Sequence, residues 1–112
     1  MKKGPDPINS FIGEGTLVKG EINATGSLFI NGQVEGLINI EGDVFIGEKG
    51  KVVGNVIGAK VVVSGHITGD ITAKTGLEIT KNGNVEGEIT CDKLIFENGS
   101  TYKGRVHVGK GS

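Results

Sequence analysis

The chain has 112 residues and a formal net charge of −1, and 21 of its residues are glycine while 25 are valine or isoleucine. Glycine costs a helix about 1 kcal/mol per position relative to alanine, so this composition excludes a helical bundle and favours a single β domain. The near-neutral charge provides no basic surface for duplex nucleic acid, and no nucleic-acid partner is expected.

The first ten residues, MKKGPDPINS, are predicted to form a flexible tail. They contain two lysines but no apolar stretch of the kind that a secretory signal requires, so the expected location is the cytoplasm. The lysines would attract anionic lipid only weakly, and we expect weak or no direct membrane binding. A second tail is predicted over residues 109–112, which leaves residues 11–108 as the folded domain.

A short pattern repeats along the chain, with an apolar residue two positions before a glycine and another two positions after it. The first copy is VKGEINA and the last is YKGRVHV. The central glycines follow one another at intervals of 15 to 18 residues: Gly20, Gly36, Gly54, Gly69, Gly87 and Gly104. A second apolar piece, such as LFI at 28–30, follows each of the first five glycines. Such a period is typical of a solenoid rather than of a meander of hairpins.

Alternation of apolar and polar residues over three to five positions predicts short strands between turns. Three strands and three corners per repeat give a coil of triangular cross-section, and six coils stacked about 4.8 Å apart give a rod of roughly 25–30 Å. Left-handed β-helices follow a hexapeptide period that this chain lacks. We therefore predict an all-β, right-handed parallel β-helix of about six coils without a capping helix. Corners with positive φ are expected at Gly32, Gly83 and Gly99.

The alternation separates inward from outward side chains. Like residues recur at equivalent inward positions of successive coils, which fills a narrow core without large aromatic side chains. The first coil is predicted to contribute Val18, Ile22, Ala24, Leu28 and Ile30, and the incomplete sixth coil Tyr102, Val106 and Val108. Cys91 has no cysteine partner in the chain and is expected to be a small buried apolar residue.

One outward column carries mainly polar side chains. The third residue after each repeat glycine is Asn23, Asn39, Ile57, Thr72, Thr90 and His107 in turn. Asparagine and threonine ladders stabilise stacked parallel strands. In the last two coils, Glu86 and Glu88 are predicted to lie beside Lys103 and Arg105 and to form two ion pairs.

Another outward column is mainly apolar. Its residues in the second strand piece of successive coils are Phe29, Phe45, Val62, Glu78 and Ile95. Two interpretations are open: the four apolar residues form a lateral or partner-binding patch, or the phenylalanines simply stack beneath the N-terminal tail.

No catalytic constellation is found. His66 and His107 fall on different coils, and neither has a second ligand at metal-binding spacing. The phosphate-binding loop G-x-x-x-x-G-K-[ST] is absent. Asp70 and Glu88 are expected to approach each other across adjacent coils, but so short a chain has no room for the deep groove of a polysaccharide hydrolase. We predict no enzyme activity and no metal or other cofactor.

The two ends of the predicted rod are open. An exposed strand edge is a template for pairing with another chain, and solenoids usually cap it. The last coil, TYKGRVHVGKGS, still alternates when it stops, and SFIGEGTLV supplies a partial first coil. We expect end-to-end polymerisation of identical copies.

The stretches SFIGEGTLVKGEINATGSLFINGQVEGLI and IFENGSTYKGRV resemble the bactofilins, a family of polymer-forming bacterial cytoskeletal proteins. The resemblance covers residues 11–108. It implies a right-handed β-helix that assembles end to end, without nucleotide, into non-polar filaments. Such filaments serve as scaffolds for cell shape, for cell-wall enzymes and for polar or division-site machinery, at the inner face of the cytoplasmic membrane.

The resemblance also implies that polymer contacts lie in the terminal coils and include an aromatic residue near the C-terminus. Tyr102 matches that aromatic residue, and Phe96 is the other candidate. By position, Val106 and Val108 join them at the C-terminal end, and Phe11 and Ile12 form the contact at the N-terminal end. The chain itself is thus the main expected partner, with cell-wall enzymes or membrane proteins as further candidates.

Two alternative functions are considered. A secreted adhesive or ice-binding β-solenoid would use the asparagine and threonine ladders, but it requires a regular threonine array and an export signal. An acyltransferase-type β-helix would require a hexapeptide period and a catalytic histidine.

Overall fold

A computed structural model describes residues 10–109, and these residues contain eleven strands and no helix. The strands are β1 (Ser10–Ile12), β2 (Leu17–Ala24), β3 (Leu28–Ile30), β4 (Gln33–Ile40), β5 (Val44–Ile46), β6 (Lys51–Val63), β7 (His66–Thr68), β8 (Ile71–Ile79), β9 (Asn84–Cys91), β10 (Leu94–Phe96) and β11 (Thr101–Val108). Every pairing between them is parallel and joins successive coils.

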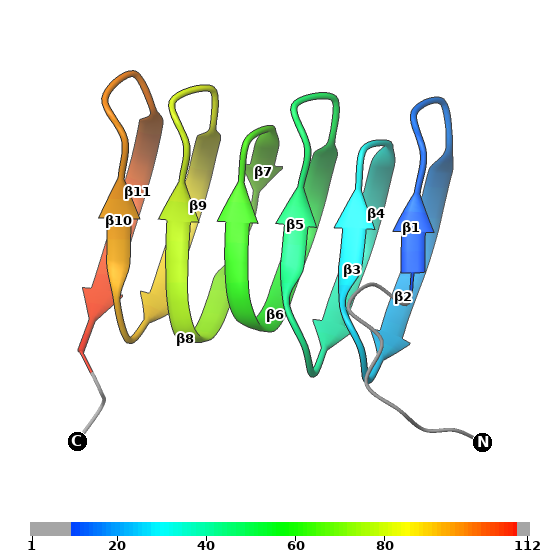
Figure 1. Cartoon of the computed structure of the whole chain (residues 1–112), viewed down its shortest axis with the longest axis horizontal. Helices are drawn as coiled ribbons and strands as arrows, with labels where there is room; N and C mark the ends of the chain where they lie inside the picture. Colours follow the sequence, from blue (N-terminus) through cyan, green and yellow to red (C-terminus); the bar gives the residue numbers. More distant parts are fainter. Residues whose placement is uncertain (1–9, 110–112) are drawn as a thin grey trace.

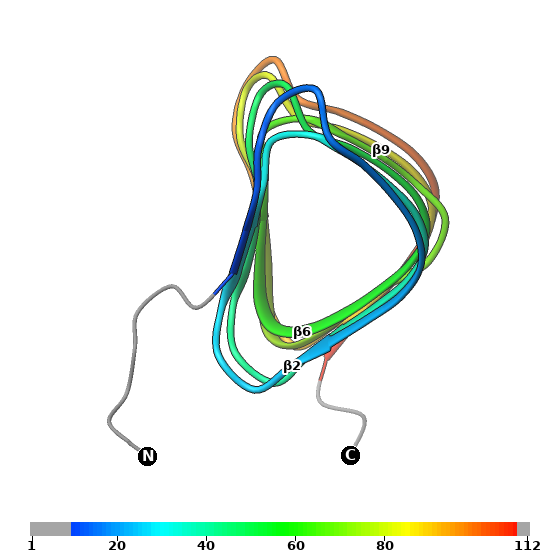
Figure 2. The same cartoon turned by 90° about the vertical axis from the view of Figure 1, so that its right-hand side faces the viewer.

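The strands wind into a solenoid of about six coils, as predicted. In Figure 1 the near strands β1, β3, β5 and β10 run upward, the far strands run downward and the chain advances from right to left, so the coil is right-handed. Figure 2 looks along the rod from its N-terminal end and shows the triangular cross-section. The predicted tails lie almost entirely outside the described residues.

The core is one apolar column along the axis of the rod. Among residues 10–109, twenty inward-facing hydrophobic residues are at most 8% exposed, and none of the buried side chains is polar or charged. Equivalent positions pair across the coils, as Ile22 does with Ile38 and Val34 with Val52. The predicted inward set is confirmed for the inner coils, because the alternation in each short strand leaves only one apolar face to bury.

The six repeat glycines form a ladder along one corner of the triangle. All six have φ between 124° and 139°, a conformation that side chains rarely adopt. Successive glycines also lie in backbone contact: a β-carbon on Gly54 would lie 1.8 Å from the carbonyl oxygen of Gly36. Strands such as β4 continue through this corner, so one long strand contributes to two faces.

The glycines of the Asn-Gly corners differ from the prediction. Gly99 has the expected positive φ of 97°, but Gly32 and Gly83 do not, so the prediction was wrong for these two. They are required for space instead of conformation. A β-carbon on Gly32 would lie 2.4 Å from the carbonyl oxygen of Gly13, and one on Gly83 would lie 2.5 Å from that of Val63.

Candidate functional site

At the C-terminal end of the rod the apolar core column is uncovered. Each inward residue of the last coil pairs with a buried residue of the coil before it, as Phe96 does with Ile79 and Val108 with Cys91. Ile79 is 0% exposed and Cys91 3%, whereas Phe96 is 47% exposed and Val108 54%. These side chains are therefore core residues that lack the next coil.

Tyr102 lies at the same open end and is half-buried. Its ring centroid lies 5.9 Å from that of Phe96, and its hydroxyl donates a hydrogen bond of 3.1 Å to the carbonyl oxygen of Gly87. Burial, with smaller contributions from Glu88 and Cys91, raises the pKa of the Tyr102 hydroxyl above its ordinary value of 10.0. The hydroxyl is thus satisfied within the chain, and the ring is left as an apolar surface.

Val106 is partly buried against the core, and Leu94 completes this apolar end surface. Leu94 was predicted as an inward residue of the fifth coil but not as part of the end contact. Its position in the last complete apolar piece was the available signal.

The N-terminal end is smaller and aliphatic. Ile12 faces inward and is only 8% exposed, while Leu17 is 50% exposed. Val18, Ile22 and Ala24 are only partly buried, because no described coil covers them. These three were predicted as inward residues of the first coil, but they were not identified as an end surface.

Phe11, which was predicted at the N-terminal end contact, lies on the outer face of the rod. Its side chain is 66% exposed and stacks on Phe29, with ring centroids 5.5 Å apart. The strict alternation of β1 explains this position, because Ile12 faces the core and its neighbour must then face outward.

Terminal strands at both ends have one free edge among the described residues. At one end β10 pairs with β8 and β11 with β9, and at the other end β1 pairs with β3 and β2 with β4. Backbone amide and carbonyl groups along the other edges of these four strands face away from the rod. Each end thus combines an apolar surface with unpaired strand edges, which is a surface suited to association with another chain.

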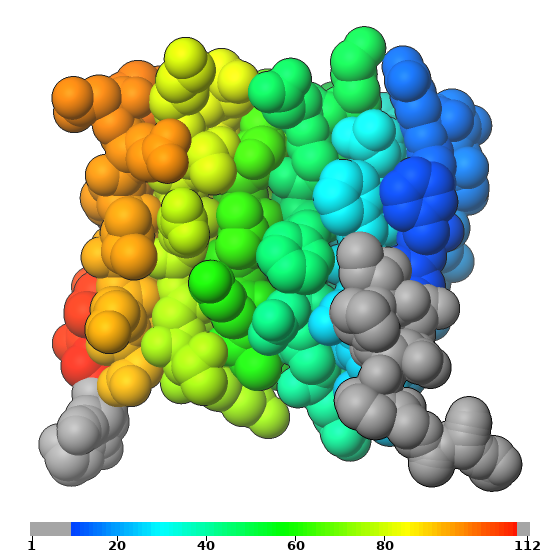
Figure 3. Space-filling model, viewed as in Figure 1, coloured from blue at the N-terminus to red at the C-terminus, as the bar shows by residue number. Residues whose placement is uncertain are grey.

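An outward apolar ladder runs along the face made by β1, β3, β5, β8, β10 and the end of β6, which Figure 3 views directly. The register places its residues in one column in the predicted order, with Phe11 at its start: Phe11, Phe29, Phe45, Val62, Glu78 and Ile95. Ile95 is 49% exposed at the far end, and the residues between the ends are partly covered by their neighbours in the column.

The outward column of asparagine and threonine residues also has the predicted register. Asn23 pairs with Asn39 and Thr72 with Thr90, but Ile57 interrupts the column in the middle and His107 ends it. The column is therefore not the regular threonine array that an ice-binding surface requires.

The charged residues of the last two coils form a different contact from the predicted one. Lys103 pairs with Glu86 and Arg105 with Glu88 in the strand register, but neither pair forms a salt bridge. Instead the Nε2 atom of His107 lies 3.5 Å from Oε2 of Glu88, where both side chains are about half exposed. Long side chains on an exposed edge gain little from pairing, so register alone does not determine the contact.

The remaining titratable residues form no reaction centre within residues 10–109. The side chain of Asp70 accepts a hydrogen bond of 3.4 Å from the backbone amide of Glu88, which is the predicted approach across coils. No described group of three or more histidine, cysteine or acidic residues could hold a metal ion. Burial, followed by the charge of Asp92, raises the pKa of the Cys91 thiol above 9.0, so the thiol stays protonated. Within the same residues, no helix is long and apolar enough to cross a membrane.

Comparison with known proteins identifies relatives over nearly the whole chain. A family model described as "Bactofilin: Polymer-forming cytoskeletal" matches residues 10–107. The chain is 30% identical to bactofilin BacP of Myxococcus xanthus over 101 residues, which are 90% of this chain and 42% of BacP. It is 29% identical to bactofilin BacO of the same organism over 98 residues, which are 88% of this chain and 78% of BacO. The chain thus spans less than half the length of BacP.

Solved structures agree with this result. The fold superposes with a TM-score of 0.86 on a subunit of the cryo-EM reconstruction of Thermus thermophilus bactofilin double helical filaments, at 27% identity, covering 90% of this chain and 100% of that one. A crystal structure of a phenylalanine-to-arginine mutant of the Thermus bactofilin superposes with a TM-score of 0.74 at 27% identity, covering 78% of this chain and 97% of that one.

Proposed function

The chain belongs to the bactofilin family of polymer-forming cytoskeletal proteins, and from this membership we propose that it assembles end to end into filaments through its two terminal coils. The observation that carries the proposal is the uncovered core column at each end. Phe96 and Val108 are about half exposed, although their equivalents in inner coils are fully buried. Complete burial of such a side chain is worth about 1.5–3 kcal/mol.

Contact between like ends would make the filament non-polar. The C-terminal surface, with Phe96, Tyr102, Val106 and Val108, then meets the same surface of a second copy, and the N-terminal surface meets its own counterpart. Such isologous contacts follow a twofold axis and are self-complementary. At the N-terminal end we assign the contact to Ile12 together with Val18, Ile22 and Ala24, with Phe11 at its outer margin.

Assembly of this kind requires no nucleotide. Apolar burial and pairing of free strand edges supply the association energy, and neither involves hydrolysis. We propose that the polymer has a structural, non-catalytic role as a cytoplasmic scaffold near the inner face of the membrane. It would support cell shape, the positioning of cell-wall enzymes, or polar and division-site organisation. The relative from Thermus forms double helical filaments, and we propose that filaments of this chain likewise associate in pairs.

Negative-stain electron microscopy of the purified protein and of Tyr102→Arg tests the end contact. The wild type should form filaments without added nucleotide. The variant should form none, because the twofold axis would bring two arginines together in an apolar contact. Circular dichroism should remain β-rich in both proteins. Thr72→Arg, on a lateral face, is the matched control and should still form filaments.

Filaments that are unchanged in Tyr102→Arg would contradict the assignment of Tyr102 to the contact. A wild type that stays monomeric at high protein concentration would contradict end-to-end assembly itself.

A further inference from the structure

We propose that the outer apolar ladder is the surface through which two filaments pair, that the paired subunits run antiparallel, and that Phe29 of one copy enters a hollow beside Gly76 of the other. This inference rests on the proposed filament and identifies the face by which a second copy binds. Phe29, Phe45 and Val62 form the centre of this ladder, and the column runs from the first coil to the last.

Gly76 is unlike the repeat glycines and the glycines of the Asn-Gly corners. Its φ is not in the positive range that only glycine adopts readily, and the atom nearest to an added β-carbon would be 3.5 Å away. Neither the backbone nor the packing requires a glycine at this position. By contrast, a β-carbon on Gly50 or Gly65 would lie within 2.6 Å of a backbone oxygen. The fold of a single subunit therefore gives no reason for a glycine at position 76.

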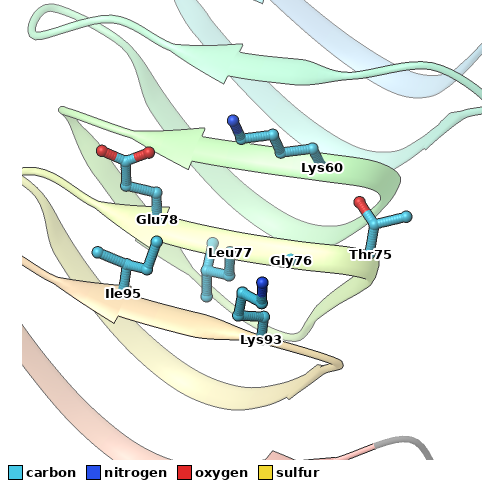
Figure 4. Close-up of a pocket in the computed structure, with 7 residues that line it drawn as sticks. All are labelled: Lys60, Thr75, Gly76, Leu77, Glu78, Lys93 and Ile95. Atoms are coloured by element: carbon cyan, nitrogen blue, oxygen red, sulfur yellow. The ribbon is translucent and has the colours of Figure 1, made fainter.

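Gly76 lines a hollow of about 310 Å³ on the ladder face, next to Glu78 and Ile95. Figure 4 shows Lys60, in β6, on one side of Gly76 and Lys93, directly before β10, on the other. A cavity of about 150 Å³ accepts benzene, so the hollow has room for a phenyl ring. Its lysine side chains provide methylene groups for contact and cations for the face of an aromatic ring.

The ladder identifies which ring of a second copy would reach this hollow. Its six positions are spaced evenly, with the midpoint between Phe45 and Val62. A twofold axis across the face at that midpoint reverses the order of the coils. Phe29, in the second position, then faces Glu78, in the fifth, and Phe45 faces Val62. The phenyl ring of Phe29 is thereby brought to the hollow beside Glu78, twice in each pair of subunits.

The same axis also matches charges. Lys60 lies in β6 two residues before Val62, and Asp43 lies directly before β5, two residues before Phe45, at the corresponding place in the adjacent coil. In the antiparallel pair Asp43 of each copy faces Lys60 of the other. A parallel pair related by a twofold axis along the rod would instead place Phe29 against Phe29 and leave both hollows empty. The charges and the hollow thus favour the antiparallel arrangement.

The lateral contact through the outer ladder is weak for one pair of subunits and strong for a pair of filaments. A face of six strands with three residues each measures roughly 29 Å by 10 Å, or roughly 300 Å² per subunit. Twice this area is below the roughly 1,200 Å² that stable protein pairs bury. Within a filament the contacts of successive subunits add, because the first contact makes the following ones intramolecular. We therefore expect pairing only after end-to-end assembly.

Electron microscopy of filament width tests the hollow with the variants Gly76→Val and Phe29→Ala. Both should form filaments as long as those of the wild type, but single rather than paired. Gly76→Val is the sharper of the two, because valine suits a strand at this position and should leave the unfolding midpoint equal or higher. Thr72→Val, on another face, is its matched control and should leave the pairs intact.

Filaments of Gly76→Val and Phe29→Ala that remain paired would overturn the proposal. A wild type with single filaments only would overturn pairing but leave end-to-end assembly in place, whereas a wild type without filaments would overturn both.

Cross-linking tests the antiparallel register. Asn31 and Thr80 lie two residues after Phe29 and Glu78, and so they should face each other across the pair. A short bis-maleimide should link Asn31→Cys to Thr80→Cys in mixed filaments and neither variant to itself, and the native Cys91 is buried. Links within each single variant would overturn the antiparallel arrangement.

Discussion

Gly36 lies directly against Gly20 of the preceding coil, so that a β-carbon on Gly36 would lie 1.9 Å from the carbonyl oxygen of Gly20. The same contact recurs down the ladder and sets how closely the coils stack at this corner. It acts together with the positive φ of each glycine, so two independent constraints fall on one residue type. The corner therefore tolerates no side chain.

The first prediction follows from this contact. Gly54→Ala should destabilise the fold by more than about 4 kcal/mol, because the added carbon would force two coils apart and the backbone would be strained. Urea unfolding followed by circular dichroism measures the loss. Gly76→Ala is the matched control and should unfold within about 1 kcal/mol of the wild type. Equal midpoints for Gly54→Ala and the wild type would contradict the role of the ladder.

The second prediction concerns alkaline pH. The pKa of Tyr102 is raised in the folded chain, first by burial, so the neutral hydroxyl is favoured. The stabilisation that the buried neutral hydroxyl gives is complete below the ordinary pKa of 10.0, and it is lost as pH rises through the higher folded pKa. Filaments should therefore disassemble over that range, measured by light scattering. Tyr102→Phe filaments should survive to higher pH. Identical pH profiles would show that Tyr102 ionisation does not control assembly.

The third prediction distinguishes a non-polar from a polar filament. If like ends meet, Tyr102→Arg should stop at dimers joined by their N-terminal ends, and Ile22→Arg at dimers joined by their C-terminal ends. The double variant should be monomeric. Analytical ultracentrifugation gives the mass directly. A polar filament, in which unlike ends meet, would instead give monomers for each single variant.

The fourth prediction concerns Glu78, the only charged residue of the outer ladder among the described strands. Glu78→Val should strengthen pairing between filaments by roughly 1 kcal/mol per contact. Packing of Phe29 from the second copy then no longer removes water from a charged carboxylate. Sedimentation at increasing salt measures the change. Glu48→Val, outside the ladder, is the control. Weaker pairing between Glu78→Val filaments would mean that the carboxylate makes a favourable contact with the second filament.

Much of the fold could be predicted from the sequence because a solenoid repeats local information. The glycine interval defines the coil, and alternation in pieces such as LFI at 28–30 determines which side chains face inward. Ile30, Ile46 and Ile79 occupy one column for this reason, and the outer ladder follows from the same register. The end surfaces were found less completely, since Val18 and Ile22 match the buried residues of inner coils in type.

Other features depend on distances between coils. Gly32 and Gly83 are needed for close backbone approach rather than for positive φ. The partner of Glu88 is His107 rather than Arg105, because flexible exposed side chains are not fixed by strand register. Ser10 belongs to β1, and for residues 1–9 the flexible tail remains a prediction.

The high glycine and valine–isoleucine content, together with the interval of 15 to 18 residues, determined that this chain forms a coiled β-rod. Period and alternation are local properties, and they persist whatever lies in the next coil. Only the tertiary structure decided which glycines are required. It separates the ladder of Gly20 to Gly104, where backbone meets backbone, from Gly76, where a side chain would fit. Steric contact between residues about 16 positions apart exists only once the coils are stacked, so composition alone cannot reveal it.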